Sequence, residues 1–207
     1  TRYIPLLLLP GSKRRLASYF KQLHRLHMAI SDVSGSGVNV DSSKSVFYGA
    51  VLGLFPDIEV YTVHLVRDVR ASEGSMYRLK TEGMGKFARR NTWWNSVRWM
   101  AVNFLAESVP KISGTRYLRV RYEDLINHPE VTLRQISDMV NEAFSGDFID
   151  GSNADLKKTH TLAGSRVRFK EGSLELKLDE RWKEKLPLKN LEIVDFLTKR
   201  FRGRYGY

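Results

Sequence analysis

The chain has 207 residues, 42% of them hydrophobic and 28% charged, so it can bury the core of one globular domain spanning residues 1–207. It contains no cysteine, which excludes a disulfide framework, a cysteine nucleophile and cysteine-ligated zinc. The formal net charge of +11 indicates an anionic partner. Small phosphorylated or sulfated ligands fit this charge, and because no familiar nucleic-acid-binding motif is present we expect no nucleic-acid partner.

The N-terminal segment carries neither a membrane span nor a signal-peptide pattern. The apolar run of residues 4–9 is too short to cross a bilayer; Pro5 interrupts it and Pro10 follows it. The chain starts at Thr1, which suggests a fragment of a longer protein. The missing signal and the missing cysteine together favour a cytoplasmic protein of bacterial origin.

The predicted elements alternate between helices and strands. In chain order they are a helix over residues 12–30, a strand over 38–41, a helix over 42–54, a strand over 60–66, a helix from Asp68, a helix over 86–108, a strand over 117–121, a helix over 129–144, a short helix around Trp182 and a helix over 190–201. The residues from Gly146 to about Leu178 read as a long loop. This order predicts an α/β fold with a parallel sheet flanked by helices.

Arg67 marks a candidate anion site. It ends the apolar strand over residues 60–66, and Asp68 stands next to it as the expected N-cap of a helix that carries Ser75. Backbone N–H groups at a helix N-terminus attract anions, and an arginine adds a planar fork of donors for phosphate oxygens. On these residues alone, a surface ion pair for Arg67 and a solvated Ser75 are equally open.

Lys44 repeats this arrangement at the end of the strand over residues 38–41. Strand ends of an open parallel sheet converge on one crevice, so Lys44 and Arg67 could address the same ligand. The alternative is that Asp41 or Ser42 simply caps the next helix and leaves Lys44 exposed.

The strand over residues 117–121 ends in Tyr122, whose ring could stack on a purine. Glu123 and Asp124 follow it, and we expect one of them to cap the next turn. Farther along, the segment 159–172 holds two glycines and several cations. It reads either as a clamp over a phosphate or as a solvated surface loop.

Four segments in this order resemble the sulfotransferase family that uses 3'-phosphoadenylyl sulfate as donor, and the likeness runs from Val38 to Tyr207. The segment from Arg67 to Ser75 is similar to the motif that binds the 3'-phosphate, with the same spacing of eight residues. The strand before Tyr122 resembles the one whose tyrosine contacts adenine. Residues 41–44 resemble the strand-end lysine motif, and residues 160–182 resemble the late loop of bacterial and carbohydrate-type members.

The resemblance implies a sulfotransferase fold of the P-loop-NTPase-like kind and transfer of a sulfuryl group to a hydroxyl or amine of a carbohydrate or small-molecule acceptor. The donor would leave as adenosine 3',5'-bisphosphate. The residues implied for the site are the catalytic Lys44 at the leaving oxygen and the donor-binding Arg67, Ser75, Tyr122, Arg168 and Lys170. No metal is implied, since arginine, lysine and helix N-termini can supply the positive charge.

Two features depart from the family pattern. The late loop reads Gly164-Ser165-Arg166 where the family has Gly-Asn-Pro. The N-terminal loop that cradles the 5'-phosphosulfate has no equivalent, and we expect it upstream of Thr1, so the fold would be N-terminally incomplete and the chain alone could be inactive. A P-loop-type kinase and a non-catalytic nucleotide- or polyanion-binding module are the alternatives.

Several other residues have structural interpretations. We expect His64 to be a hydrogen-bonded core residue, and His24 and His27 lie one helical turn apart without a nearby third metal ligand. Trp93, Trp94 and Trp99 are expected in the core, with an acceptor pocket as the alternative for one of them.

Overall fold

The computed structural model describes residues 17–42, 45–53, 55, 57–81, 91–156 and 171–207. These residues form two compact units. Of the described residues, the first unit contains those up to His64 and Ala101–Leu118, and the second contains those within Leu65–Met100 and Arg119–Tyr207. The elements β1, β2 and α6 contribute residues to both.

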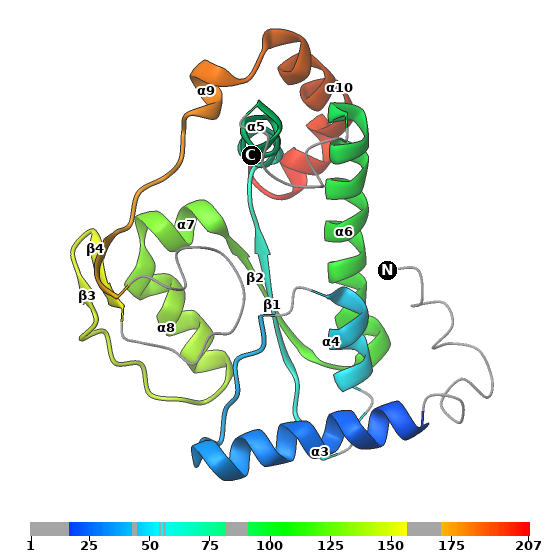
Figure 1. Ribbon diagram of the computed structural model, residues 1–207, viewed down its shortest axis with the longest axis vertical. Helices are drawn as coiled ribbons and strands as arrows, with labels where there is room; N and C mark the ends of the chain where they lie inside the picture. Colours follow the sequence, from blue (N-terminus) through cyan, green and yellow to red (C-terminus); the bar gives the residue numbers. More distant parts are fainter. Residues whose placement is uncertain (1–16, 43–44, 54, 56, 82–90, 157–170) are drawn as a thin grey trace. The chain divides into compact units, whose positions relative to one another are not determined.

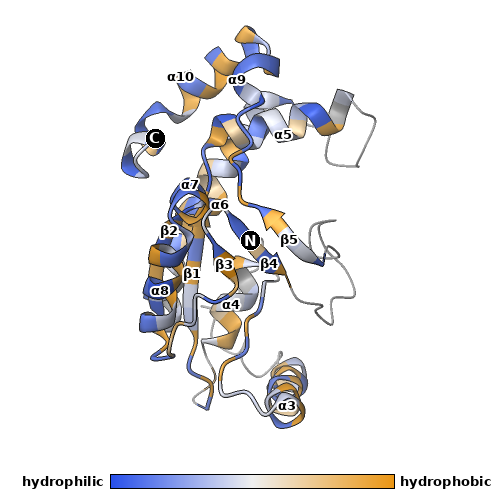
Figure 2. Ribbon diagram, turned by 90° about the vertical axis from the view of Figure 1, so that its left-hand side faces the viewer, coloured by the Kyte–Doolittle hydropathy of each residue, from blue (hydrophilic) through white to orange (hydrophobic). Residues whose placement is uncertain are grey.

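The first unit is built on two helices, α3 (Ala17–Ser34) and α4 (Val46–Leu52). Hydrophobic and hydrophilic residues are interleaved along α3 (Figure 2), which suits a helix that buries one side. Its buried residue Leu23 joins Ala50, Val51 and Leu52 in a hydrophobic core. Both helices were predicted, but the N-cap of α4 is Ser45, whose side chain accepts from the Tyr48 N–H, and neither Asp41 nor Ser42.

The predicted strand over residues 38–41 is wrong, because this segment has no regular structure. The hydroxyl of Ser36 accepts from the Val38 N–H at 3.3 Å and donates to the Val38 carbonyl at 2.7 Å. A local serine thus satisfies backbone groups that a strand would offer to a neighbour.

Two neighbouring strands, β1 (Tyr61–Val66) and β2 (Arg116–Arg121), form a parallel pair (Figure 1). Both were predicted to within one residue. In β1 the side chains of His64 and Val66 are buried, whereas Val63 and Leu65 are exposed. His64 is the hydrogen-bonded core residue expected, with ring nitrogens 2.7 Å from the Tyr117 hydroxyl and 2.8 Å from Asn103 Oδ1.

Helices make up most of the described part of the second unit. They are α5 (Val69–Thr81), the first part of α6 (Thr92–Ser113), α7 (Tyr122–Asn127), α8 (Pro129–Met139), α9 (Trp182–Lys185) and α10 (Leu188–Arg204). Val66, Val69, Val120 and Val194 lie in its core with at most 4% of their surface exposed. The short α7 was not predicted. The helix α8 ends earlier than expected because Asn141 takes a positive φ of 57°, a conformation that stops helices.

The segment expected to be a long loop contains a small antiparallel sheet. Its strands are β3 (Ile149–Asp150), β4 (Asn153–Leu156) and β5 (Gly172–Glu175), paired in the order β3-β4-β5. The strands are too short to show a clear alternation of apolar residues, which is why the sequence pattern missed them.

The α/β class with a parallel sheet and flanking helices is confirmed. Across the described ranges, none of the helices combines the length and the apolar character that crossing a membrane requires.

Candidate functional site

The site is built where β1 passes into α5, within the second unit. Asp68 caps α5 as expected: its carboxylate accepts from the Arg70 N–H at 2.8 Å, and its carbonyl accepts from the Ser72 N–H at 2.9 Å. Arg67 therefore lies directly between the end of a buried strand and the positive end of a helix. This is the location that favours an anion.

Arg67, Ser75 and Tyr122 come together in the structure. The Nη1 of Arg67 donates to the Ser75 hydroxyl at 3.4 Å, so a side chain that precedes α5 reaches a residue within the first two turns of that helix. The Cζ of Arg67 lies 4.9 Å from the centre of the Tyr122 ring. Tyr122 is the first residue of α7, directly after β2, so the two strand ends supply both side chains.

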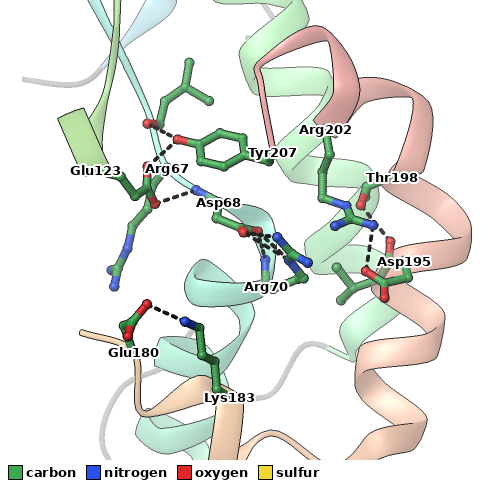
Figure 3. A network of polar contacts seen from close by, with 12 residues as sticks. Arg67, Asp68, Arg70, Glu123, Glu180, Lys183, Asp195, Thr198, Arg202 and Tyr207 are labelled. Carbon is green, nitrogen blue, oxygen red and sulfur yellow. Dashed lines mark hydrogen bonds and ion pairs between the residues drawn. The ribbon is translucent and has the colours of Figure 1, made fainter. Parts of the chain in front are cut away.

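Arg67 has no carboxylate partner among the described residues. Its contacts there are the long hydrogen bond to Ser75 and the face of Tyr122, while its Nε is buried and has no hydrogen-bond partner. Figure 3 shows its guanidinium extending past Asp68 without a dashed line to any acidic residue drawn. A buried cationic donor without a partner is unfavourable, and an anionic ligand would satisfy it.

Two neighbouring cations in the wall of the larger cavity differ from Arg67 because each is paired with a carboxylate. Arg70 forms a bidentate ion pair with Asp68, and its Nη2 lies 2.6 Å from Oδ2 (Figure 3). Hydrogen bonding to Asp68 raises the pKa of Arg70. Lys183 is paired with Glu180. Of these three cations, Arg67 is therefore the one best placed to take a ligand.

Two adjoining cavities open at this place. The larger, about 320 Å³, is lined by Arg67 and Tyr122 and has four basic and four acidic residues in its wall. The smaller, about 200 Å³, is lined by Ser75 together with Arg78, Arg181 and Lys185. Trp182 of α9 contributes to both walls. Hydrogen bonding and charge from Arg181 lower the pKa of Asp179, which also lines both cavities, to about 2.

Glu123 and Tyr207 are site residues that the sequence did not reveal. We expected Glu123 or Asp124 to cap a turn, but neither caps α7 or α8. Glu123 instead accepts from the Asp68 N–H at 3.2 Å and from the hydroxyl of Tyr207. Burial, and then the hydrogen bond to Glu123, raise the pKa of Tyr207. Only the aromatic residues around Gly206 could have drawn attention to this end of the chain.

Three predicted site residues, Lys44, Arg168 and Lys170, lie outside the described residues. The predicted core position is wrong for Trp93 and Trp94, which are 47% and 57% exposed, whereas Trp99 is half-buried and bonds to the Arg67 carbonyl.

The two helical histidines have other partners than a metal. His24 lies 3.4 Å from Asp57, and His27 lies 2.8 Å from the Tyr48 hydroxyl. Within the described ranges, no three potential metal ligands form a group.

Comparisons with known proteins agree on one family. The sequence pattern of the Sulfotransferase family matches residues 12–146. A solved structure titled as the sulfotransferase domain from the curacin biosynthetic pathway superposes with a TM-score of 0.50 at 17% identity, covering 95% of this chain and 76% of that chain. A search of curated proteins gave no match. Since the family pattern extends over most of the chain and the fold agrees with it, the chain belongs to the sulfotransferase family.

Proposed function

We propose that the chain transfers a sulfuryl group from 3'-phosphoadenylyl sulfate to a hydroxyl or amine of a carbohydrate or small-molecule acceptor. In this reaction the acceptor oxygen or nitrogen bonds to sulfur and the bond from sulfur to the phosphate oxygen breaks. The acceptor proton leaves to a base, and adenosine 3',5'-bisphosphate is released. Positioning in line and positive charge at the leaving oxygen are what such a step mainly needs from a protein.

The observation that supports the proposal most strongly is that Arg67 has no carboxylate partner among the described residues. Its guanidinium lies beside a serine hydroxyl and an aromatic face, at the start of α5, and the described residues offer it no carboxylate. A phosphate group could accept from Arg67 and Ser75 together, and an adenine ring could lie against Tyr122. A nucleotide with a 3'-phosphate presents both groups.

The remaining roles come from the sequence. Lys44 would stabilise the oxygen of the departing phosphate, and Arg168 and Lys170 would close over the 3'-phosphate. Arginine and lysine can supply this charge without a metal ion, so the proposed mechanism assigns none.

Isothermal titration calorimetry with adenosine 3',5'-bisphosphate tests the proposal. Replacing Arg67 by alanine (Arg67→Ala) removes a charge-assisted contact, which is worth about 1.5–3 kcal/mol, so the affinity should fall by about 10- to 100-fold. Ser75→Ala should cause a smaller loss of about 2- to 10-fold, because it removes a neutral partner.

Arg200→Ala is the matched control. Arg200 is an exposed residue of α10, so the variant has the same change in charge while leaving the Arg67 region intact. Equal affinity in the wild type and Arg67→Ala, or an equal loss in Arg200→Ala, would contradict the proposal. The second result would instead favour a polyanion-binding module, whose binding depends on total charge and falls steeply with salt.

A further inference from the structure

Side chains from distant parts of the second unit hold the end of β1. Three backbone polar groups there, which belong to two consecutive peptide units, are hydrogen-bonded to side chains. The Val66 carbonyl accepts from the Tyr207 hydroxyl at 2.9 Å, the Arg67 carbonyl accepts from the Trp99 indole N–H at 3.0 Å, and the Asp68 N–H donates to the Glu123 carboxylate at 3.2 Å. We call Trp99, Glu123 and Tyr207 the clamp residues.

The Arg67 carbonyl and the Asp68 N–H lie between the two elements, and the Val66 carbonyl lies at the last residue of β1. β1 ends at Val66 and α5 begins at Val69, so the backbone between them leaves both the sheet and the helix ladder. Val66 is 1% exposed and Asp68 is 6% exposed, which keeps water away from these groups. Buried peptide groups without partners are unfavourable, so the clamp residues determine the path of this backbone.

The clamp residues are themselves held in place. The ring of Tyr205 packs edge-on against Trp99, with centres 5.6 Å apart, and Tyr205 is 2% exposed. Gly206 has a φ of +78°, which is accessible to glycine and strained for other residues, and it separates Tyr205 from Tyr207 in the chain. The guanidinium of Arg121 lies 4.5 Å from the centre of the Tyr207 ring.

Tyr207 also connects two of these contacts. Its single hydroxyl hydrogen is shared between the Val66 carbonyl and the Glu123 carboxylate, and Glu123 in turn accepts from the Asp68 N–H. Figure 3 shows this connection around the Arg67 backbone, on the side away from the guanidinium. The described partners of the guanidinium itself are only a 3.4 Å hydrogen bond and an aromatic face, so its backbone largely sets its position.

We propose that Trp99, Glu123 and Tyr207 are positioning residues that hold Arg67 ready for the 3'-phosphate of the donor nucleotide. This inference rests on the proposed function and adds to it a source of selectivity. The clamp residues act on Arg67 through its backbone, and Glu123 and Tyr207 also line the cavity that contains Arg67. Removing a clamp hydrogen bond should therefore weaken the binding of nucleotides that carry a 3'-phosphate. The binding of nucleotides that lack this phosphate should stay unchanged.

Calorimetry with two probes on the 207-residue chain tests this inference. Tyr207→Phe removes the hydroxyl and keeps the ring against Arg121. We expect its affinity for adenosine 3',5'-bisphosphate to fall about 3- to 10-fold, the value of one or two hydrogen bonds, and its affinity for adenosine 5'-monophosphate to stay unchanged. Trp99→Phe removes the indole N–H and keeps a ring beside Tyr205, and it should give the same pattern.

A double-mutant cycle separates positioning from a general loss of structure. With Arg67 already replaced by alanine, Tyr207→Phe should cause no further loss, because the group that it positions is gone. Tyr117→Phe is the matched control, since it removes a tyrosine hydroxyl bonded to His64, and it should leave both affinities unchanged.

The possible results are distinct. A Tyr207→Phe variant that keeps its full preference for the 3'-phosphorylated probe, or one that weakens both probes equally, would overturn the positioning role. So would a loss that persists in the Arg67→Ala background. A wild-type chain without preference between the probes would overturn the proposed nucleotide site, and the positioning role with it.

Discussion

Gly74 allows α5 and α9 to pack closely, and its replacement by alanine is a stringent test of the structure. A Cβ at this position would overlap the Cβ of Trp182 and lie 3.2 Å from its Cα. The obstacle is the start of a neighbouring helix and not the flexible end of a side chain. Relief therefore requires α9 to move away from α5.

The expected change in stability is the difference of two effects. Alanine in place of glycine inside a helix stabilises by about 1 kcal/mol, whereas overpacking a contact costs about 1–3 kcal/mol. Gly74→Ala should thus lower the free energy of unfolding by about 0–2 kcal/mol. Gly203→Ala in α10 is the control, because an added Cβ there meets no described atom within 4 Å. It should stabilise by about 0.5 kcal/mol, since it lies in the last helical turn.

Urea unfolding followed by circular dichroism measures both variants. The free energies of unfolding of the two variants should differ by about 0.5–2.5 kcal/mol, which corresponds to about 1–10 °C in melting temperature for a protein of this size. Equal stabilisation by Gly74→Ala and Gly203→Ala would refute the close packing of α5 on α9. Because Trp182 lines both cavities, Gly74→Ala should also weaken nucleotide binding, while Gly203→Ala should not.

Two further predictions concern buried and charged groups of the second unit. Thr92→Val should lower the free energy of unfolding by about 2–3 kcal/mol in urea titrations. The reason is that it removes the hydroxyl that bonds to Glu73 at 2.6 Å and to Asn190 at 2.7 Å. A loss below about 0.5 kcal/mol, as is usual for surface changes, would contradict this prediction. Asp179, whose pKa falls from 3.8 to about 2 beside Arg181, stabilises the fold above pH 4 and loses this contribution as the pH falls from 4 to 2. Asp179→Asn should therefore be less stable than wild type at pH 7 by about 0.5–1 kcal/mol, a small value because solvent screens the exposed Arg181. A stability difference that persisted at pH 2 would rule out this ion pair as the cause.

The parts of the fold that the sequence predicted have strong local patterns. The strand β1 is a run of β-branched and apolar residues, and Asp68 signals a helix start directly after it. The convergence of Arg67 and Ser75 follows in part from local structure, because Ser75 lies within the first two turns of the helix that begins two residues after Arg67. Both features depend on neighbours in the chain, which is why pattern and structure agree.

The parts that were missed depend on residues far away in the chain. Val38–Asp41 looks like a strand, but a strand also needs a partner, and the hydroxyl of Ser36 bonds to Val38 in its place. Glu123 looks like a capping residue, but its partners are 55 and 84 positions away. Trp93 and Trp94 resemble core residues by type, yet they lie in the first turn of α6 with their rings packed on each other and exposed.

The net charge of the chain and the geometry of its candidate site select ligands in different ways. A net charge of +11 attracts any polyanion over a long range, and salt screens that attraction. At the larger cavity, by contrast, basic and acidic residues are equal in number, so its wall adds little net attraction. Arg70 is already paired with Asp68, which leaves recognition to the geometry around Arg67. A single oriented guanidinium beside Ser75 and Tyr122 selects for a ligand with one phosphate next to one aromatic ring. This selection depends on the shape of the ligand, whereas attraction by the net charge does not.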